Sequence, residues 1–449
     1  MIAALAVLAL QQPSPPAADT SHGRPCLIVI DSIGHEYREI ALPGGRKNSF
    51  AGGGVLAHCQ GTTSTLATDS IARYAEVNRI DLVGHVRIRD TVIALDASNA
   101  SYFMSDERLE AHRNVVAVNK ANGSILRGPN LTYYRVARGI RDTLEMYATQ
   151  RPTIEYRGAG AADTVEPYII VGDRVRFKGN DRMWAAGKAT IDRSDFAARG
   201  DSMHLDETVG MGFLVGKPRV EGKGTQSYTL TGTRIELALA AREIKQVKAL
   251  GEGVATGTDW HLNADTIHLL LDRRKLQQVF AWGKTTRPHA VSTLQDIKAD
   301  SIALDVPDQI LTEARAYGDA FSSTKKDSTS GPANTDWIRG DTLTARWAQI
   351  PDSAGVARSK LRRVIARGSA RALTHLYNDK DSTTVALGPS INYSRGKVID
   401  IALKQSGIDR VIASGGADGV HLEPRPPTPP DTTAKKDSTP PARVKKDST

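Results

Sequence analysis

The residues best placed to do chemistry are aspartates that recur along the chain, most of them roughly thirty residues apart. Each begins a short phrase of alternating apolar and polar residues, as in DSIALD at Asp300–Asp305, and other copies begin at Asp69, Asp201 and Asp265. Recurrent carboxylates suggest either calcium ligands or paired carboxylates for glycan hydrolysis. Calcium-binding rolls repeat every nine residues rather than every thirty. An aspartate that caps a turn is therefore the simpler interpretation.

Other catalytic and metal-binding patterns are absent from the sequence. The 11 histidines form no His-x-x-x-His pair with an intervening glutamate, and the 2 cysteines form no Cys-x-x-Cys. Gly251–Gly257 is similar to a phosphate-binding loop, but it lies inside a strand-like phrase rather than before a helix. No Gly-x-Ser-x-Gly nucleophile elbow occurs. The sequence therefore predicts a protein that is not an enzyme and holds no metal or cofactor.

The aspartates belong to a repeat that occurs about ten times. After a first phrase such as DTIHLL at Asp265–Leu270 comes a polar turn, and then a second phrase of the form Val-x-Ala-x-Gly, as at Val279–Gly283 and Val364–Gly368. Alternation of apolar with polar or small residues is the period of a β-strand. A repeated strand pair buries its apolar face only against its neighbours, so the units must stack.

The repeat predicts an elongated all-β fold, one solenoid-like sheet of about ten antiparallel strand pairs. A glycine recurs in the second phrase, as at Gly84, Gly283 and Gly368. Glycine inside a strand marks a bend or a close backbone approach. Bends at one height would turn the sheet into a V-shaped trough or a flattened roll. The alternative is an interior that closes and packs completely.

An open trough would have an elongated apolar groove as its inner face. Low aromatic content, 5% of the chain, agrees with a groove because small inward side chains leave width in the trough. The candidate groove-lining residues are the inward positions of the phrases: Ile80, Leu82, Val86, Leu205, Ile235, Leu237, Val247, Ile267, Leu269, Val279, Ala281, Ile302, Leu304, Val364 and Ala366.

The N-terminal residues 1–20 form a signal peptide-like segment. Met1–Leu10 is an apolar run too short to span a bilayer, and cleavage is expected within residues 11–20. The run lacks a basic region before it, so the natural start is expected upstream. A plain apolar N-terminal stretch without a targeting role is the alternative.

The rest of the chain divides by composition. Residues 21–64 form an N-terminal extension, and residues 65–421 form the repeat domain, in which an insertion at 135–170 allows a break. Residues 422–449 repeat Lys-Lys-Asp-Ser-Thr and have the composition of a disordered tail.

The formal charge of +9 comes from 59 basic and 50 acidic residues, some of them in the tail. The excess suits an anionic glycolipid, and it equally suits a solvated surface. No basic stripe interleaved with aromatics indicates nucleic acid. Cys26 and Cys59 are a candidate disulfide in an exported chain, worth roughly 3–4 kcal/mol of stability. Two free thiols are the alternative.

The phrases at Leu262–Leu270 and Leu276–Gly283 resemble the OstA-like repeats of the lipopolysaccharide-transport proteins LptA, LptC and the N-terminal, periplasmic part of LptD. The resemblance covers about residues 65–421. It implies a β-jellyroll, often called a β-taco, whose apolar trough carries the acyl chains of lipopolysaccharide through the periplasm towards the outer membrane. It also implies end-to-end strand pairing with other jellyroll proteins of this kind, and no catalytic residues.

The chain departs from this family in two ways. It has about twice the repeats of the short bridge proteins, and no outer-membrane barrel pattern follows residue 421. One chain would then do what several stacked subunits do elsewhere. Unpaired strands at the ends of the trough would be templates for a partner's strand.

Three functions are compatible with the repeat. The first is a periplasmic bridge that binds lipopolysaccharide, the second a structural or adhesive β-solenoid without ligand, and the third a glycan-processing β-helix enzyme. The solenoid predicts large residues filling the inner face, and the enzyme predicts carboxylates clustered on neighbouring strands. Alanine and glycine at inward positions, and the regular spacing of the aspartates, favour the lipid-binding bridge.

Overall fold

The computed structural model describes residues 26–424, except for 138, 158–165, 225–226, 241–242, 293–294, 325–334, 352–356, 377–388 and 405–406. The signal peptide-like segment and nearly all of the C-terminal tail lie outside the described residues.

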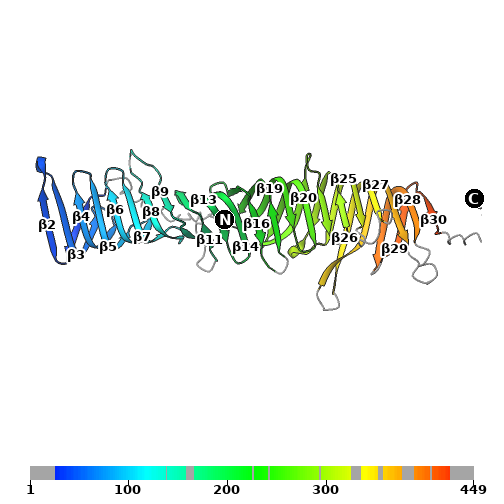
Figure 1. Cartoon of the computed structure of the whole chain (residues 1–449), viewed down its shortest axis with the longest axis horizontal. Helices are drawn as coiled ribbons and strands as arrows, with labels where there is room; N and C mark the ends of the chain where they lie inside the picture. The colour runs from blue at the N-terminus through cyan, green and yellow to red at the C-terminus, as the bar shows by residue number, and fades with distance from the viewer. Residues whose placement is uncertain are drawn as a thin grey trace, which may run out of the picture.

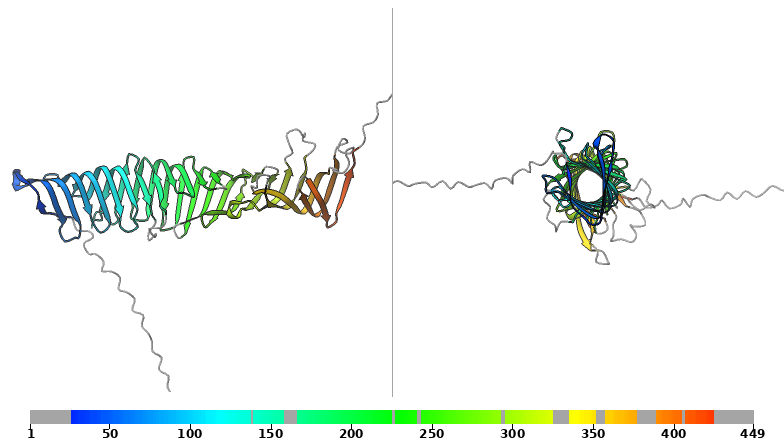
Figure 2. Two further views of the ribbon diagram at one scale, coloured as in Figure 1. Left: turned by 90° about the horizontal axis from the view of Figure 1, so that it is seen from below. Right: turned by 90° about the vertical axis from the view of Figure 1, so that its left-hand side faces the viewer.

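The described chain forms one long antiparallel sheet of 30 strands, rolled about its long axis (Figures 1 and 2). This confirms the elongated all-β fold that the repeat predicts. Two 3-10 turns, at Pro43–Gly45 and Pro307–Gln309, interrupt the strands. Within the described ranges no helix is long and apolar enough to cross a membrane.

The strands follow one another in chain order along the roll. The first fifteen are β1 (Ile28–Ile33), β2 (Glu36–Ala41), β3 (Lys47–Cys59), β4 (Thr65–Tyr74), β5 (Arg79–Arg89), β6 (Ile93–Phe103), β7 (Arg108–Asn119), β8 (Ile125–Tyr134), β9 (Glu145–Thr149), β10 (Thr153–Tyr156), β11 (Tyr168–Val171), β12 (Arg174–Lys178), β13 (Arg182–Asp192), β14 (Phe196–Asp206) and β15 (Met211–Val215). The remainder are β16 (Arg219–Gly222), β17 (Tyr228–Thr231), β18 (Arg234–Ala240), β19 (Glu243–Thr256), β20 (Trp260–Asp272), β21 (Lys275–Trp282), β22 (His289–Ser292), β23 (Gln295–Lys298), β24 (Ser301–Asp305), β25 (Glu313–Thr324), β26 (Trp337–Pro351), β27 (Ala357–Leu376), β28 (Ser390–Lys404), β29 (Gly407–Ser414) and β30 (Asp418–Leu422).

The recurrent glycine is a sharp corner in the strand. In β5, Gly84 and His85 both have left-handed backbone angles, with φ of 80° and 44°, and the pairing with β4 shifts there. In β27, Gly368 and Ser369 repeat this pair with φ of 74° and 47°. Glycine adopts the left-handed region without the steric cost that a Cβ imposes. Similar consecutive left-handed pairs occur at Gly187–Lys188, Gly216–Lys217, Gly251–Glu252 and Gly318–Asp319.

The corners divide the roll lengthwise into two arms, and each arm ends in a row of turns. The first turn row contains the turns at 75–78, 104–107, 179–181 and 207–210. The second turn row contains those at 60–64, 90–92, 120–124 and 193–195. Asn119, beside the second turn row, donates a hydrogen bond to Asn180 in the first, so the two rows meet on the side of the roll away from the corners. We call the line where they meet the seam.

The recurrent aspartates lie at the corner, some within a long strand and some, such as Asp300, directly before a strand. Asp69 is inside β4 and Asp265 is inside β20. The Asp265 carboxylate accepts hydrogen bonds from the backbone N–H groups of Thr285 and Thr286, at 2.8 and 2.7 Å. At this corner, therefore, the predicted turn-capping role is confirmed.

The sheet extends into the region that composition assigns to an N-terminal extension. β1 and β2 both pair with β3, and β3 pairs with β4. Around the insertion, β8 pairs with both β9 and β10, and the pairing continues through β12 to β13. Hydrogen bonds therefore connect the sheet on both sides of residues 135–170.

Candidate functional site

The candidate lining residues all lie on the inner face of the roll. The most exposed of the fifteen is Leu205, at 8%, and Leu82, Ile235, Val247, Ile267, Leu269, Val279 and Ala366 are fully buried. They belong to one hydrophobic cluster that runs the length of the sheet. Alternation along the strands therefore predicts which residues are buried, and the lining of a lipid groove by these residues stays a prediction.

Directly paired inward residues form a row in which a large side chain alternates with alanine, strand after strand. We call it the alanine row: Ile235, Ala249, Ile267, Ala281, Ile302, Ala316, Leu343, Ala366 and Ile399. The first phrase of each repeat supplies the isoleucine or leucine, and the second phrase supplies the alanine. Each alanine leaves a dip between two larger side chains, so the inner surface is evenly ridged.

A second inward row runs beside the alanine row. Its paired members are Leu237, Val247, Leu269, Val279, Leu304, Ala314, Ala345 and Val364. Neither row contains a polar or charged residue between Ile235 and Val364. A long, uniform apolar surface of this kind can contact hydrocarbon without fixing it at one position.

Three cavities lie under the seam. Their volumes are about 60, 30 and 40 Å³. Each cavity is lined by residues next to both turn rows. Cys59 and Arg135 line the first, Asn119 and Asn180 the second, and Tyr156 and Glu207 the third. All are smaller than the roughly 150 Å³ apolar cavity that holds a benzene-sized molecule. In this state the side chains fill the space that a lipid tail would occupy.

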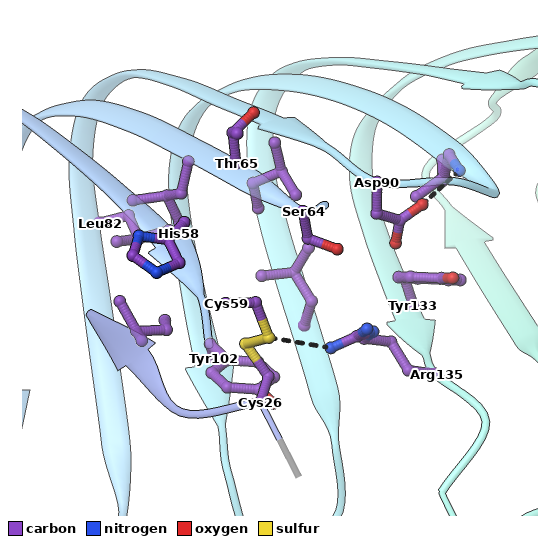
Figure 3. Close-up of a pocket in the computed structure, with 15 residues that line it drawn as sticks. Cys26, His58, Cys59, Ser64, Thr65, Leu82, Asp90, Tyr102, Tyr133 and Arg135 are labelled. Atoms are coloured by element: carbon purple, nitrogen blue, oxygen red, sulfur yellow. Dashed lines mark hydrogen bonds between the residues drawn. A yellow bond between two sulfur atoms is a disulfide. The ribbon is translucent and has the colours of Figure 1, made fainter. Parts of the chain in front are cut away.

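A buried polar cluster closes the seam beside the cavity of about 60 Å³, whose lining residues Tyr102, Arg135, Cys26 and Cys59 are drawn in Figure 3. Glu107, in the first turn row, is 2% exposed. Its carboxylate accepts hydrogen bonds from the backbone N–H of Cys26 at 2.9 Å and from the Tyr102 hydroxyl at 2.6 Å. The Arg135 guanidinium lies 3.5 Å from the same carboxylate and 3.9 Å from Cys59 Sγ. Cys26 and Cys59 form a disulfide. This bond fixes Cys26, which donates to Glu107 in the first turn row, to the end of β3 beside the second turn row.

The electrostatics of this cluster depend on its burial. Burial, together with the adjacent Glu107 carboxylate, raises the pKa of the Tyr102 phenol. Tyr102 therefore stays protonated and continues to donate to Glu107. The arginine balances the carboxylate charge, as a buried ion requires.

Two further polar contacts cross the seam. Asn119 Nδ2, at the end of β7, donates to Asn180 Oδ1 in the first turn row at 2.9 Å. The Tyr156 hydroxyl, at the end of β10, donates to Glu207. A single side-chain hydrogen bond contributes only about 0.5–1.5 kcal/mol net. These two links are therefore weaker than the backbone ladder that joins the strands.

The seam was not predicted from the sequence. Its contacts join residues far apart in the chain: Cys26 and Glu107 are 81 residues apart, and Asn119 and Asn180 are 61 apart. No local pattern marks such pairs. The aspartates of the repeat are not gathered into a site, and among the described residues no group of three or more His, Cys, Asp or Glu side chains could hold a metal ion.

The two ends of the roll expose strand edges with apolar side chains. At one end β1 and β2 lie outside β3, and Tyr37 and Ile40 are 54% and 41% exposed. At the other end β29 and β30 lie outside β28, and Val420 and Leu422 are 54% and 56% exposed. Exposed edges of this kind can pair with a strand of another chain.

Comparison with protein-family models and with curated proteins finds no match to this chain.

Proposed function

We propose that this protein is a periplasmic lipid-binding bridge that carries the acyl chains of lipopolysaccharide towards the outer membrane. In this role the protein catalyses no reaction. The saccharide headgroup stays outside in water, and the acyl chains lie against the inner face.

The observation that carries the proposal is the alanine row. Each methylene group removed from water contributes about 0.8 kcal/mol, so a tail along this surface is held firmly. Because Ile267, Ala281 and Ile302 are followed by the same pattern in later repeats, successive positions along the row are nearly equivalent. A carrier needs this combination of retention and equivalent sites.

The seam supports a route of entry from the side. The cavities lie directly beneath it, and side-chain contacts such as Asn119–Asn180 link its two turn rows. If the two arms move apart about the corner, these contacts open while the backbone ladder stays intact. The cavities would then join into a groove wide enough for a tail.

Partners of the same architecture would attach at the ends. The exposed edges of β2 and β30 offer backbone hydrogen bonds to an added strand, and the inner rows would continue into the partner. In this proposal the chain is one long segment of a bridge between two membranes.

Photo-crosslinking tests the proposal directly. A photoreactive amino acid would replace Leu269, Val279 or Ile302, which are 0–1% exposed and point inward. Gln278 is the matched control, because it is adjacent in β21 and points outward. Adducts with labelled lipopolysaccharide at the inward positions alone would support the proposal. A folded protein that gives no adduct at any inward position would refute it.

One observation favours a second function, a structural or adhesive β-solenoid without ligand. The inner face is filled by side chains, and the cavities under the seam are small. Substitution of Ala281 by glutamate separates the two functions. It would abolish lipid adducts at Leu269 in a carrier, whereas a solenoid would show only lower stability and no adducts before or after the change.

A further inference from the structure

The outer face of the sheet carries a row of stacked side chains that is interrupted at one strand. Across β13, β14 and β15 the paired residues Trp184, His204 and Phe213 contact one another: Trp184 stacks on His204 with ring centroids 4.8 Å apart, and Phe213 meets His204 edge to face at 5.1 Å. Guanidinium groups cover the outer rings: Arg176 lies 5.2 Å from the Trp184 centroid and Arg234 lies 4.2 Å from that of Phe213. Here each flat group is covered by a neighbour.

The same outward row reaches β24 with small residues. Its paired members are His268, Phe280, Ala303 and Arg315, and beside them run Trp282, Ser301 and Tyr317. Ala303 and Ser301 form a low floor, so the rings on either side are not in mutual contact. Trp282 is 40% exposed and Tyr317 is 44% exposed. The result is a hollow of about 430 Å³ on the outer surface, within the size range of small-molecule sites.

The width of the hollow fits one flat ring. Its walls stand on β21 and β25, which flank β24 and are therefore two strand spacings apart, roughly 9–10 Å. One flat ring in contact with both walls occupies about 7–8 Å, from about 3.5–4 Å on each side, so the space holds one ring and not two. An inserted ring would complete the stack that Ala303 and Ser301 interrupt.

The polar groups at the rim indicate a neutral ligand with hydroxyl groups. The Arg315 guanidinium lies 2.8 Å from Asp305 and 3.1 Å from Glu313, so its charge is already balanced. His268 has a lowered pKa because of burial and the nearby Lys248 ammonium. Its Nε2–H donates to Gln246 Oε1 at 3.1 Å, so the neutral ring offers Nδ1 as an acceptor. A pyranose ring has C–H faces for the aromatic walls and hydroxyl groups at its edge for the Ser301 hydroxyl and the rim.

We propose that the hollow between Trp282 and Tyr317 on the outer face of β21, β24 and β25 is a binding site for a neutral sugar ring of a glycan. The site faces away from the alanine row, so it does not depend on lipid binding inside the roll. If the proposed lipid function fails, the sugar site can still be present, and the reverse also holds.

Saturation-transfer NMR on the purified full-length chain tests the site. The probes are glucose, galactose and N-acetylglucosamine as methyl pyranosides and as trisaccharides, with adenosine monophosphate as a planar, anionic competitor. We expect transfer to the C–H protons of at least one sugar. Ala303→Leu, which fills the floor, and Trp282→Ala, which removes a wall, should each weaken binding by at least tenfold.

Trp184→Ala is the matched control, because Trp184 belongs to the same outer row but lies in a covered stack; it should bind sugar as the wild type does. Circular dichroism checks that each variant is folded. The proposal is overturned if no sugar shows transfer, if Ala303→Leu binds as the wild type does, or if adenosine monophosphate binds more tightly than every sugar.

Discussion

The Asp69 carboxylate lies against the α-carbon of Gly84 in the next strand, so closely that a Cβ at Gly84 would be 2.1 Å from Asp69 Oδ2. The two halves of the repeat are therefore one structural unit: the aspartate of the first phrase occupies the space beside the corner glycine of the second. The same contact joins Asp173 to Gly187, Asp201 to Gly216, Asp300 to Gly318 and Asp341 to Gly368.

Gly84→Ala should destabilise the roll. The left-handed backbone costs an alanine about 1–2 kcal/mol, and the collision with Asp69 adds to that cost. Urea unfolding should show a lower midpoint. Combining Gly84→Ala with Asp69→Ala should recover part of the lost stability. The double variant removes the steric clash with the carboxylate, whereas the cost of the left-handed backbone remains.

Gly407→Ala is the control for this pair. A Cβ at Gly407 meets nothing within 4 Å, and its φ is not left-handed. If Gly84→Ala unfolds at the same urea concentration as Gly407→Ala, the corner does not need a glycine.

Removal of the disulfide should loosen the N-terminal end. The bond closes a loop with a sequence separation of 33, and such a loop contributes roughly 3–4 kcal/mol in the chain-entropy model. The double variant Cys26→Ser, Cys59→Ser should lose about this much stability in urea, and added reductant should affect the wild type alone. A reductant effect on the double variant would mean that the change acts elsewhere.

Leu269→Ala should separate stability from lipid binding. Leu269 is fully buried, and Leu→Ala in a core costs about 2–5 kcal/mol. In a lipid carrier the new space lies in the groove, so binding of labelled lipopolysaccharide should be kept or increased despite a lower melting temperature. Leu270→Ala, on the outward face of the same strand, should change both quantities little. A parallel loss of stability and lipid binding at Leu269 would speak against a groove at this position.

Locking the seam should slow lipid loading if the tails enter from the side. Cysteines at Asn119 and Asn180, joined by a short bis-maleimide, would tie the two turn rows where the side chains already touch. We expect at least tenfold slower uptake of fluorescent lipopolysaccharide, measured by stopped flow. Cysteines at Val92 and Lys120, joined in the same way within the second turn row, should leave the rate unchanged. Equal rates in both locked proteins would mean that lipid enters through the ends.

His204 should make stability depend on pH. Burial, with a smaller contribution from Arg182, lowers the pKa of His204 below its usual value of 6.5. The folded protein therefore binds fewer protons than the unfolded chain, and stability should fall as the pH drops below 6.5 towards the lowered pKa. Urea midpoints at pH 7.5 and 5.5 measure this effect. In His204→Phe, which keeps a ring against Trp184, the midpoint should change less between the two pH values, and an identical change would exclude His204 as its source.

The sequence predicts the inner face well because strand alternation is local. Each long strand keeps Ile, Leu, Val or Ala on its inner side. The corner takes up two residues, an even number, so the inward–outward alternation continues unchanged from Leu82 before Gly84 to Val86 after it. The contact between corner glycine and aspartate was not foreseen, although both residues were noted separately. It depends on the register between neighbouring strands, which composition does not determine.

The seam and the outer hollow could not be predicted for a related reason. Glu107 and Asn180 take part in the seam because the roll brings distant turns together. No residue near them in the sequence indicates which distant residue each of them contacts. The hollow exists because Ala303 has a small side chain and lies between aromatic rings that belong to two other strands. In each case the signal is a relationship across strands rather than a pattern along one.

The spacing of the alanine row sets how a bound tail would move. Large and small side chains alternate with every strand, so the corrugation has a period of about two strand spacings, roughly 9–10 Å. This period is several times longer than the methylene repeat of a hydrocarbon chain, and the two do not come into step. As a tail moves, some methylene groups would leave the space beside an alanine while others enter one. The contact energy of the whole tail would then change little with its position, so the tail would slide along the row with low friction and no preferred position.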